Sequence, residues 1–458
     1  MKRRAAALWL VMFAVYAATI GMHAFDGSQY GGDEPHYLLT AKSMVDEGDV
    51  DLTNEYRDRG YRSFYPLVLY PHGVLSKGRL NEPQGVGFPL LIAPAYALAG
   101  PKGVEVLLAA IAALSILLAY RLALRVVPDP WALGATLAVG LSPPLLAYSS
   151  AVSPELTAAA ALCGAALLAL RLTERPTRPA AYGCFLLIGV LPWLNPVLLV
   201  PGAVIAYFGF RAVRRARRPV LAVTAVEVVG FSVALYIGLS EGLYGGPTPY
   251  SAALPGESGI DASFPGGYLG RAYRLVALFI DRDYGLLRWA PVLALALLGA
   301  LVLWRERRSG LARAIPGLRG EESAALLCGA VALAQLLVAV FLSRRAFGFW
   351  FPGRNLMPAL PLALPLVALG LRRAPRAGAL LAVLGVAASV WIVLDVRLGS
   401  GGLITPLPDA PWGPLERVFP VFTQGSTYPF VLAAALALAA AGALALDSHR
   451  AGRRRSPG

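Results

Sequence analysis

The sequence predicts an all-α polytopic membrane protein with about twelve transmembrane helices. Two features of composition and one of pattern lead to this fold class. Of the 458 residues, 57% are hydrophobic and only 15% are charged, whereas soluble domains carry about 25% charged residues. The mean hydropathy is +0.60. Apolar runs of about 17–25 residues recur along the chain, which is the length that an α-helix needs to cross a bilayer.

The apolar segments follow one another closely, so we expect one membrane-embedded domain over 1–458. The segments are 5–23, 103–122, 131–148, 155–171, 180–194, 197–210, 219–239, 285–304, 323–341, 355–371, 377–394 and 428–446. The region 180–210 holds two short runs that meet at Pro192 and Pro196, so either two spans or a re-entrant pair is expected there. The stretch 83–100 is apolar but short and proline-broken, and we expect it at the outer face.

Lys and Arg are concentrated in alternate connections between the predicted spans. They precede the first span and recur, for example, at 211–218 and 305–319. The positive-inside rule then predicts a multi-pass protein of the plasma (inner) membrane with both termini cytoplasmic. The net charge of +14 therefore reflects topology and contact with the lipid bilayer, and it argues against a nucleic-acid partner.

The remaining connections form three long outer loops, at 24–102, 240–284 and 395–427. Long loops are usually functional. The first one opens with an acidic motif that contains Asp33 and Glu34. A carboxylate at this position can act as a general base for a hydroxyl substrate. The same two acids are also suited to capping the helix that follows them.

Other polar and aromatic residues join the acids on the predicted outer side. Tyr65 and His72 lie among aromatic residues that suit either the bilayer interface or stacking on a sugar. Glu155 is the first residue of a predicted helix, at the end of that helix that faces the outer side. There it either caps the helix or adds a second acid to a site.

Three arginines lie at the outer membrane boundary beside aromatic residues: Arg344, Arg345 and Arg354. Arginine binds phosphate through paired, charge-assisted hydrogen bonds, although snorkelling to lipid phosphates is the alternative. The chain has no P-loop and no His-Glu-x-x-His motif. With only four histidines a histidine-rich zinc site is not expected, no cofactor is certain, and a divalent metal held by loop acids stays open.

The motif Asp33-Glu34-Pro35-His36-Tyr37 resembles the acidic first-loop motif of the GT-C superfamily of integral membrane glycosyltransferases. The nearest pattern is that of the protein O-mannosyltransferase and lipid A aminoarabinose transferase branch. The stretch 89–100 is similar to the proline-rich element before their second span, and 348–361 is similar to an arginine-containing stretch of bacterial members. The spacing between the two first-loop elements is longer than in protein O-mannosyltransferases.

The resemblance implies an enzyme that moves a monosaccharide from a polyprenyl-phosphate carrier to an extracytoplasmic acceptor. Asp33 would then be the general base, and Glu34 would orient the acceptor or share that role. Arg354, with Arg344 or Arg345, would neutralise the departing phosphate. The predicted substrate contacts are His36, Tyr37, Tyr65, His72 and Glu155.

Two other functions fit a polytopic membrane protein of this kind. A flippase or transporter of lipid-linked glycans would place polar residues through the middle of the bundle. A glycan polymerase or ligase that uses an undecaprenyl-diphosphate donor would place its main outer loop late in the chain, whereas the longest outer loop here is the first.

Overall fold

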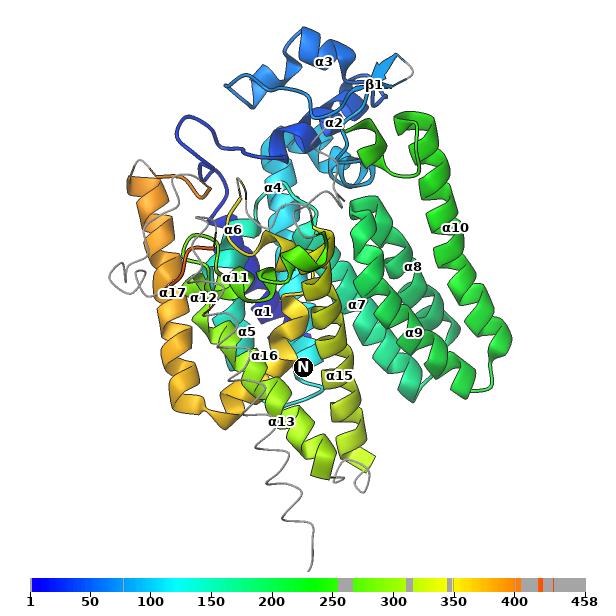
Figure 1. Cartoon of the computed structure of the whole chain (residues 1–458), viewed down its shortest axis with the longest axis vertical. Helices are drawn as coiled ribbons and strands as arrows, with labels where there is room; N and C mark the ends of the chain where they lie inside the picture. The colour runs from blue at the N-terminus through cyan, green and yellow to red at the C-terminus, as the bar shows by residue number, and fades with distance from the viewer. Residues whose placement is uncertain are drawn as a thin grey trace, which may run out of the picture.

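The computed structural model describes residues 2–76, 78–253, 267–309, 316–343, 348, 350–399, 401–404, 419–422 and 431 (Figure 1). Within this part of the chain almost all regular structure is helical. The strands β1 (Leu75–Ser76) and β2 (Arg79–Leu80) pair with each other as a short antiparallel hairpin.

Six helices of the described residues are long and apolar enough to cross a membrane, judged by length and composition. They are Gly87–Ala123, Glu155–Glu174, Pro196–Arg215, Pro219–Ala252, Gly320–Leu342 and Pro375–Leu398, and shorter apolar helices run over Trp131–Gly140, Arg178–Leu194 and Pro291–Arg305. The prediction of a multi-pass, all-α membrane protein is confirmed. The number twelve stays a prediction, because 428–446 lies outside the described residues except for residue 431.

The first predicted outer loop sits on one end of the helical bundle. Helices α2 (Glu34–Asp46) and α3 (Thr53–Arg57) lie with β1 at the top of Figure 1. Helix α2 packs on α4 (Gly87–Ala123), which also packs on α1 (Lys2–Ala17).

Helix α4 contains a break that separates its N-terminal part from the longer apolar part that follows. Gly100 has φ 59° and ψ −150°, a conformation that glycine adopts readily because it lacks a Cβ. The stretch 87–98 is therefore a helix of its own, and the span begins after the break. This arrangement agrees with the expectation that 83–100 is an element distinct from the second span.

Helices α7 (Glu155–Glu174), α8 (Arg178–Leu194), α9 (Leu199–Arg215) and α10 (Pro219–Tyr244) form a second group, and α7 joins it to α4. Between α8 and α9 the chain turns at Asn195, whose backbone is extended and whose Oδ1 accepts a hydrogen bond from the Val197 N–H at 3.1 Å. The region 180–210 is therefore two packed helices joined by a short turn.

Three predicted spans are not continuous helices. The span 131–148 divides into α5 (Trp131–Gly140) and α6 (Pro143–Tyr148), and 285–304 divides into α12 (Leu286–Trp289), a 3-10 turn and α13 (Leu295–Ser309). The span 355–371 begins with two 3-10 turns before α16 (Leu364–Arg373). Proline begins α6 and the turns at Pro291 and Pro361, because it cannot donate a backbone hydrogen bond.

Buried contacts hold these broken helices beside the first loop. The Tyr148 hydroxyl of α6 donates to the Phe351 carbonyl at 2.7 Å. A Cβ at Gly87 would collide with the Trp193 carbonyl, so only glycine allows the start of α4 to approach the end of α8 this closely. The remaining described α-helices are α11 (Arg274–Ile280), which packs on α12, α15 (Pro316–Leu337), which packs on α9, and α17 (Pro375–Leu398), which packs on α5. The broken segments α6 and α12 also pack on each other.

Candidate active site

Asp33, Glu155 and Arg354 meet in one ion-paired group. Arg354 Nη2 donates to Asp33 Oδ2 at 2.7 Å, and Arg354 Nε donates to Glu155 Oε1 at 2.7 Å. The side chains of Asp33, Glu155 and Arg354 are 28%, 12% and 15% exposed. Asp33 immediately precedes α2, Glu155 begins α7, and Arg354 follows Gly353, whose φ is 95°. Three residues singled out in the sequence are thus brought together by folding.

Asp33 stands at the N-cap position of α2, but its side chain makes no capping hydrogen bond. Its Oδ1 instead accepts a hydrogen bond from Gln84 Nε2 at 3.2 Å. Burial alone would raise the pKa of Asp33, but Arg354 and Gln84 outweigh it and hold the pKa at about 2. The interpretation of Asp33 as a simple helix cap is therefore wrong, and its carboxylate is ionised at neutral pH.

Glu34 is the next residue along the chain, and its surroundings differ. Its Oε2 accepts the Gly31 N–H and its Oε1 accepts the Val152 N–H, both at 2.8 Å. Burial raises the pKa of Glu34 to about 7, and these two N–H groups oppose the rise. Glu34 thus ties the first loop to the segment that precedes α7.

A cavity of about 380 Å³ opens on one side of the ion-paired group. Five of the residues proposed from sequence line it: Asp33, Tyr37, His72, Glu155 and Arg354. Aromatic and amide side chains from the end of α8, the turn after it, α10 and the predicted second outer loop complete the wall, among them Trp193, Asn195, Tyr236 and Tyr250. A concave hollow with aromatic walls and a few convergent charged groups is a usual form of a ligand site.

A second cavity, of about 60 Å³, lies on the other side of the same group. It is also lined by Asp33 and Arg354, and in addition by Glu34 and Glu105. Glu105 belongs to α4 and accepts a hydrogen bond from the Tyr30 hydroxyl at 2.7 Å. Asp33 and Arg354 therefore stand in the wall that the two cavities share.

Two further residues proposed from sequence, His36 and Tyr65, line neither cavity. His36 is buried behind His72, with its Nδ1 2.8 Å from the Tyr56 hydroxyl and 3.1 Å from Glu82 Oε1. Tyr65 is buried within the first loop and lines neither cavity. Arg344 and Arg345 lie outside the described residues.

Several residues at the site were not singled out in the sequence. The Trp350 ring lies 5.2 Å from the Arg354 guanidinium carbon, in a cation–π contact. The sequence does carry a signal for Glu105, because an acidic residue inside an apolar helix is often functional. The sequence carries no such signal for Gln84 and Glu82, since a single polar residue in a loop follows no pattern.

Comparison with solved structures gives several matches of low sequence identity. The apo crystal structure of ArnT from Cupriavidus metallidurans matches with a TM-score of 0.53 at 15% identity, over 86% of this chain and 72% of that chain. The same protein bound to undecaprenyl phosphate matches with a TM-score of 0.47 at 15% identity, over 85% and 71%. The oligosaccharyltransferase AglB from Archaeoglobus fulgidus, in complex with an inhibitory peptide and dolichol-phosphate, gives 0.47 at 14% identity, over 88% and 56%.

No protein-family model and no curated protein matches the chain. The likeness to apo ArnT shows a shared fold. The fold that the resemblance of the acidic first-loop motif implied is thereby confirmed, as the fold that this chain shares with ArnT.

Proposed function

We propose that this protein is a membrane glycosyltransferase that moves a monosaccharide from a polyprenyl-phosphate carrier to an acceptor on the outer face of the membrane. The observation that carries the proposal is the group formed by Asp33, Glu155 and Arg354 in the wall of the 380 Å³ cavity. It combines an acid that can take a proton with a cation that can hold a phosphate, and the fold shared with ArnT agrees with it.

The reaction assigns a separate task to each of these charges. The acceptor hydroxyl oxygen forms a bond to the anomeric carbon of the donor sugar, and the bond from that carbon to the phosphate oxygen breaks. The electron pair of that bond leaves with the phosphate, and the hydroxyl proton passes to Asp33. The negative charge that develops on the leaving phosphate is stabilised by Arg354.

Arg354 also controls how strongly Asp33 can act as a base. With the ion pair closed, Arg354 keeps the pKa of Asp33 at about 2, which is too low for effective proton abstraction. A donor phosphate that draws the guanidinium toward itself weakens this pair. The basicity of Asp33 then rises only when a donor is bound.

Glu155 is positioned to bind a hydroxyl group of a substrate. Its Oε1 is held by Arg354, while its buried Oε2 has no hydrogen-bond partner among the described residues. An acceptor atom buried without a partner is costly, and a sugar hydroxyl would satisfy it. Tyr37 and His72 line the same cavity and complete the polar contacts, with His36 supporting His72 from behind.

The proposal includes the orientation and organisation expected from the sequence. The site faces the extracytoplasmic side, both termini are cytoplasmic, and about twelve spans form one domain with outer loops at 24–102, 240–284 and 395–427. Arg344 and Arg345 are proposed as further phosphate ligands, and Tyr65 as a more distant substrate contact. Glu34, held by two backbone N–H groups, would orient the first loop around the acceptor.

The test uses the full chain in lipid nanodiscs with a panel of polyprenyl-phosphate monosaccharides and an extract of membranes and cell wall as acceptor. The readout is the release of free polyprenyl phosphate. We expect Asp33→Asn to lower the release rate by about 10²–10⁴-fold, the usual contribution of a general base. Asp58→Asn is the matched control, because Asp58 is 62% exposed and pairs with its neighbour Arg57.

The outcomes separate this proposal from the other functions. Equal turnover in wild type and Asp33→Asn removes Asp33 as the base. A folded wild-type protein that releases nothing from any monophosphate donor, but moves a labelled lipid-linked glycan across the bilayer, is a flippase instead. Turnover only with an undecaprenyl-diphosphate donor assigns it to the polymerase or ligase class.

A further inference from the structure

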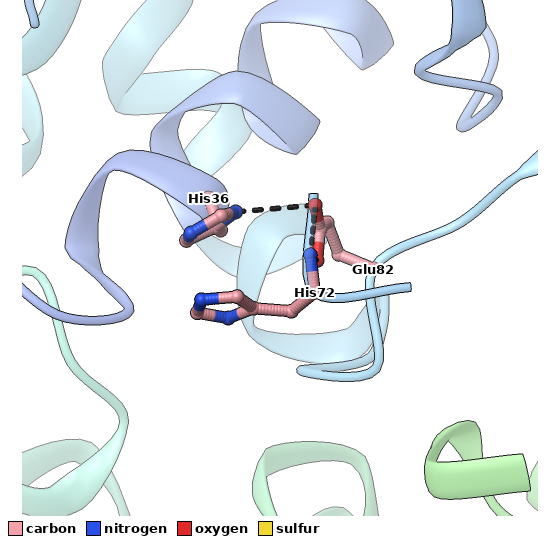
Figure 2. Close-up of side chains that lie close together, drawn as sticks. All are labelled: His36, His72 and Glu82. Carbon is pink, nitrogen blue, oxygen red and sulfur yellow. Dashed lines mark hydrogen bonds and ion pairs between the residues drawn. The ribbon is translucent and has the colours of Figure 1, made fainter. Parts of the chain in front are cut away.

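A second cluster of side chains with ligand chemistry lies behind the wall of the large cavity. His36, His72 and Glu82 each offer one ligand atom, and the three atoms lie within 4.8 Å of one another. Figure 2 shows the two imidazole rings next to each other and the Glu82 carboxylate beside them. His36 comes from α2, His72 precedes the β1–β2 hairpin, and Glu82 follows it.

The cluster is compact and largely shielded from solvent. His36 Nδ1 lies 3.1 Å from Glu82 Oε1, and the centroids of the two imidazole rings are 4.0 Å apart. The His36 and Glu82 side chains are each 2% exposed, whereas the His72 side chain is 34% exposed and reaches the large cavity. Two ligands are thus fixed in the interior, and the third is accessible.

We propose that His36, His72 and Glu82 bind a zinc ion. Two imidazoles with one carboxylate are a ligand set that zinc uses in proteins, and three protein ligands leave the fourth position for water or another group. The expectation that four histidines are too few for a zinc site assumed an all-histidine site. A carboxylate removes the need for a third histidine, and sequence alone did not bring Glu82 next to His36.

The spacing of the cluster fits tetrahedral coordination after small side-chain movements. Zinc–ligand bonds of about 2.0–2.2 Å place neighbouring ligand atoms roughly 3.3–3.6 Å apart. The Tyr56 hydroxyl donates a hydrogen bond to Glu82 Oε1, and Gln84 Nε2 lies 2.8 Å from His72 Nδ1. Such contacts are what a second shell provides to fix the orientation of zinc ligands.

A bound ion would organise the first outer loop beside the proposed active site. It would join α2 to the chain on both sides of the hairpin, which has few other regular elements to hold it. It would also fix the His72 ring, whose Nδ1 lies 3.9 Å from Asp33 Oδ1. The three ligands therefore act as positioning residues, because they hold the first-loop wall of the large cavity in place. The zinc site itself does not depend on the proposed transferase function.

The first measurement is metal content. The full chain, produced without a histidine tag and held in nanodiscs, is stripped with a chelator, incubated with Zn²⁺ and washed. Mass spectrometry of the metal then gives the molar ratio, for which we expect one zinc per chain. Loading with Co²⁺ instead should give the visible absorption bands of a tetrahedral site. A folded wild-type protein that retains no zinc and shows no such bands overturns the proposal.

Variants locate the ion. Glu82→Gln and His36→Gln should each lower zinc affinity by more than 100-fold, while His23→Gln, at an exposed histidine, should leave the ratio at one. Because either buried variant can fail to fold, Tyr56→Phe is added. It keeps all three ligands and should weaken binding by about 10–100-fold, the usual effect of losing a second-shell partner. Unchanged affinity in folded Glu82→Gln and Tyr56→Phe contradicts the site.

Discussion

The two cavities that meet at Arg354 differ in size and in the carboxylates that face them. The cavity of about 380 Å³ is lined by Asp33 but not by Glu34, and the cavity of about 60 Å³ is lined by both Asp33 and Glu34. The pKa of Asp33 is held at about 2 and that of Glu34 is raised to about 7, although the residues are adjacent. Neighbouring acids can therefore have separate roles, because their surroundings rather than their residue type set their charge.

Of the substitutions that test this difference, the loss of Arg354 should have the largest effect on transfer, because its side chain lines both cavities. We expect Arg354→Gln to lower transfer by about 10²–10³-fold, as for the loss of a preorganised charge at a transition state. It also leaves Asp33 and Glu155 without their cation. Breaking a fully buried pair costs about 3–5 kcal/mol of stability, and we expect a smaller loss here because the three side chains are 12–28% exposed. Transfer rates and thermal unfolding measure the two effects separately.

Arg354→Lys is the matched control for charge. Lysine keeps the positive charge but cannot hold both carboxylates through the two edges of a guanidinium. We expect it to recover most of the stability and only part of the transfer rate. Full recovery of both would show that a point charge at this position is sufficient.

Replacing Glu34 should affect stability more than the reaction. Glu34→Gln retains one acceptor oxygen but turns an amide group toward one of the two backbone N–H groups. The lost hydrogen bond should cost about 1–3 kcal/mol of unfolding free energy. The transfer rate should fall far less than in Asp33→Asn. A rate loss equal to that of Asp33→Asn, in a protein with unchanged unfolding, would instead give Glu34 a share of the base role.

The smallest expected effect concerns Trp350, which lines both cavities and covers the Arg354 guanidinium. Trp350→Leu removes a cation–π contact worth about 0.5–2 kcal/mol. We expect a few-fold to about 30-fold rise in the KM for the donor with little change in kcat. Trp9→Leu, at a tryptophan of α1 stacked on Phe13, is the control for loss of a tryptophan elsewhere.

The sequence predicted the charged centre of the site better than its surroundings. Asp33 and Arg354 stood out because charged residues beside apolar segments are rare, and Glu155 followed from its place at a helix start. Tyr65 was expected at the site because its ring is suited to stacking on a sugar, yet it is buried inside the first loop and lines neither cavity. Aromatic character alone does not indicate the direction in which a side chain points.

The fold class followed from composition, but the continuity of the helices did not. Hydropathy averages over a window, so an apolar stretch with a turn has the same score as an unbroken helix. The break before Pro143 and the 3-10 turn at Pro361 were hidden in this way. Gln84 and Glu82 depend on pairings between distant loop segments, which no local pattern encodes.

The ion pair between Asp33 and Arg354 joins residues that are 321 positions apart. A ribosome that adds about 5–20 residues per second needs roughly 15–65 seconds to make the intervening chain. Throughout that interval the nascent first loop carries an acid whose cation has not yet been synthesised. The proposed site is therefore incomplete until the segment that carries Arg354 has been synthesised and has packed against the first loop.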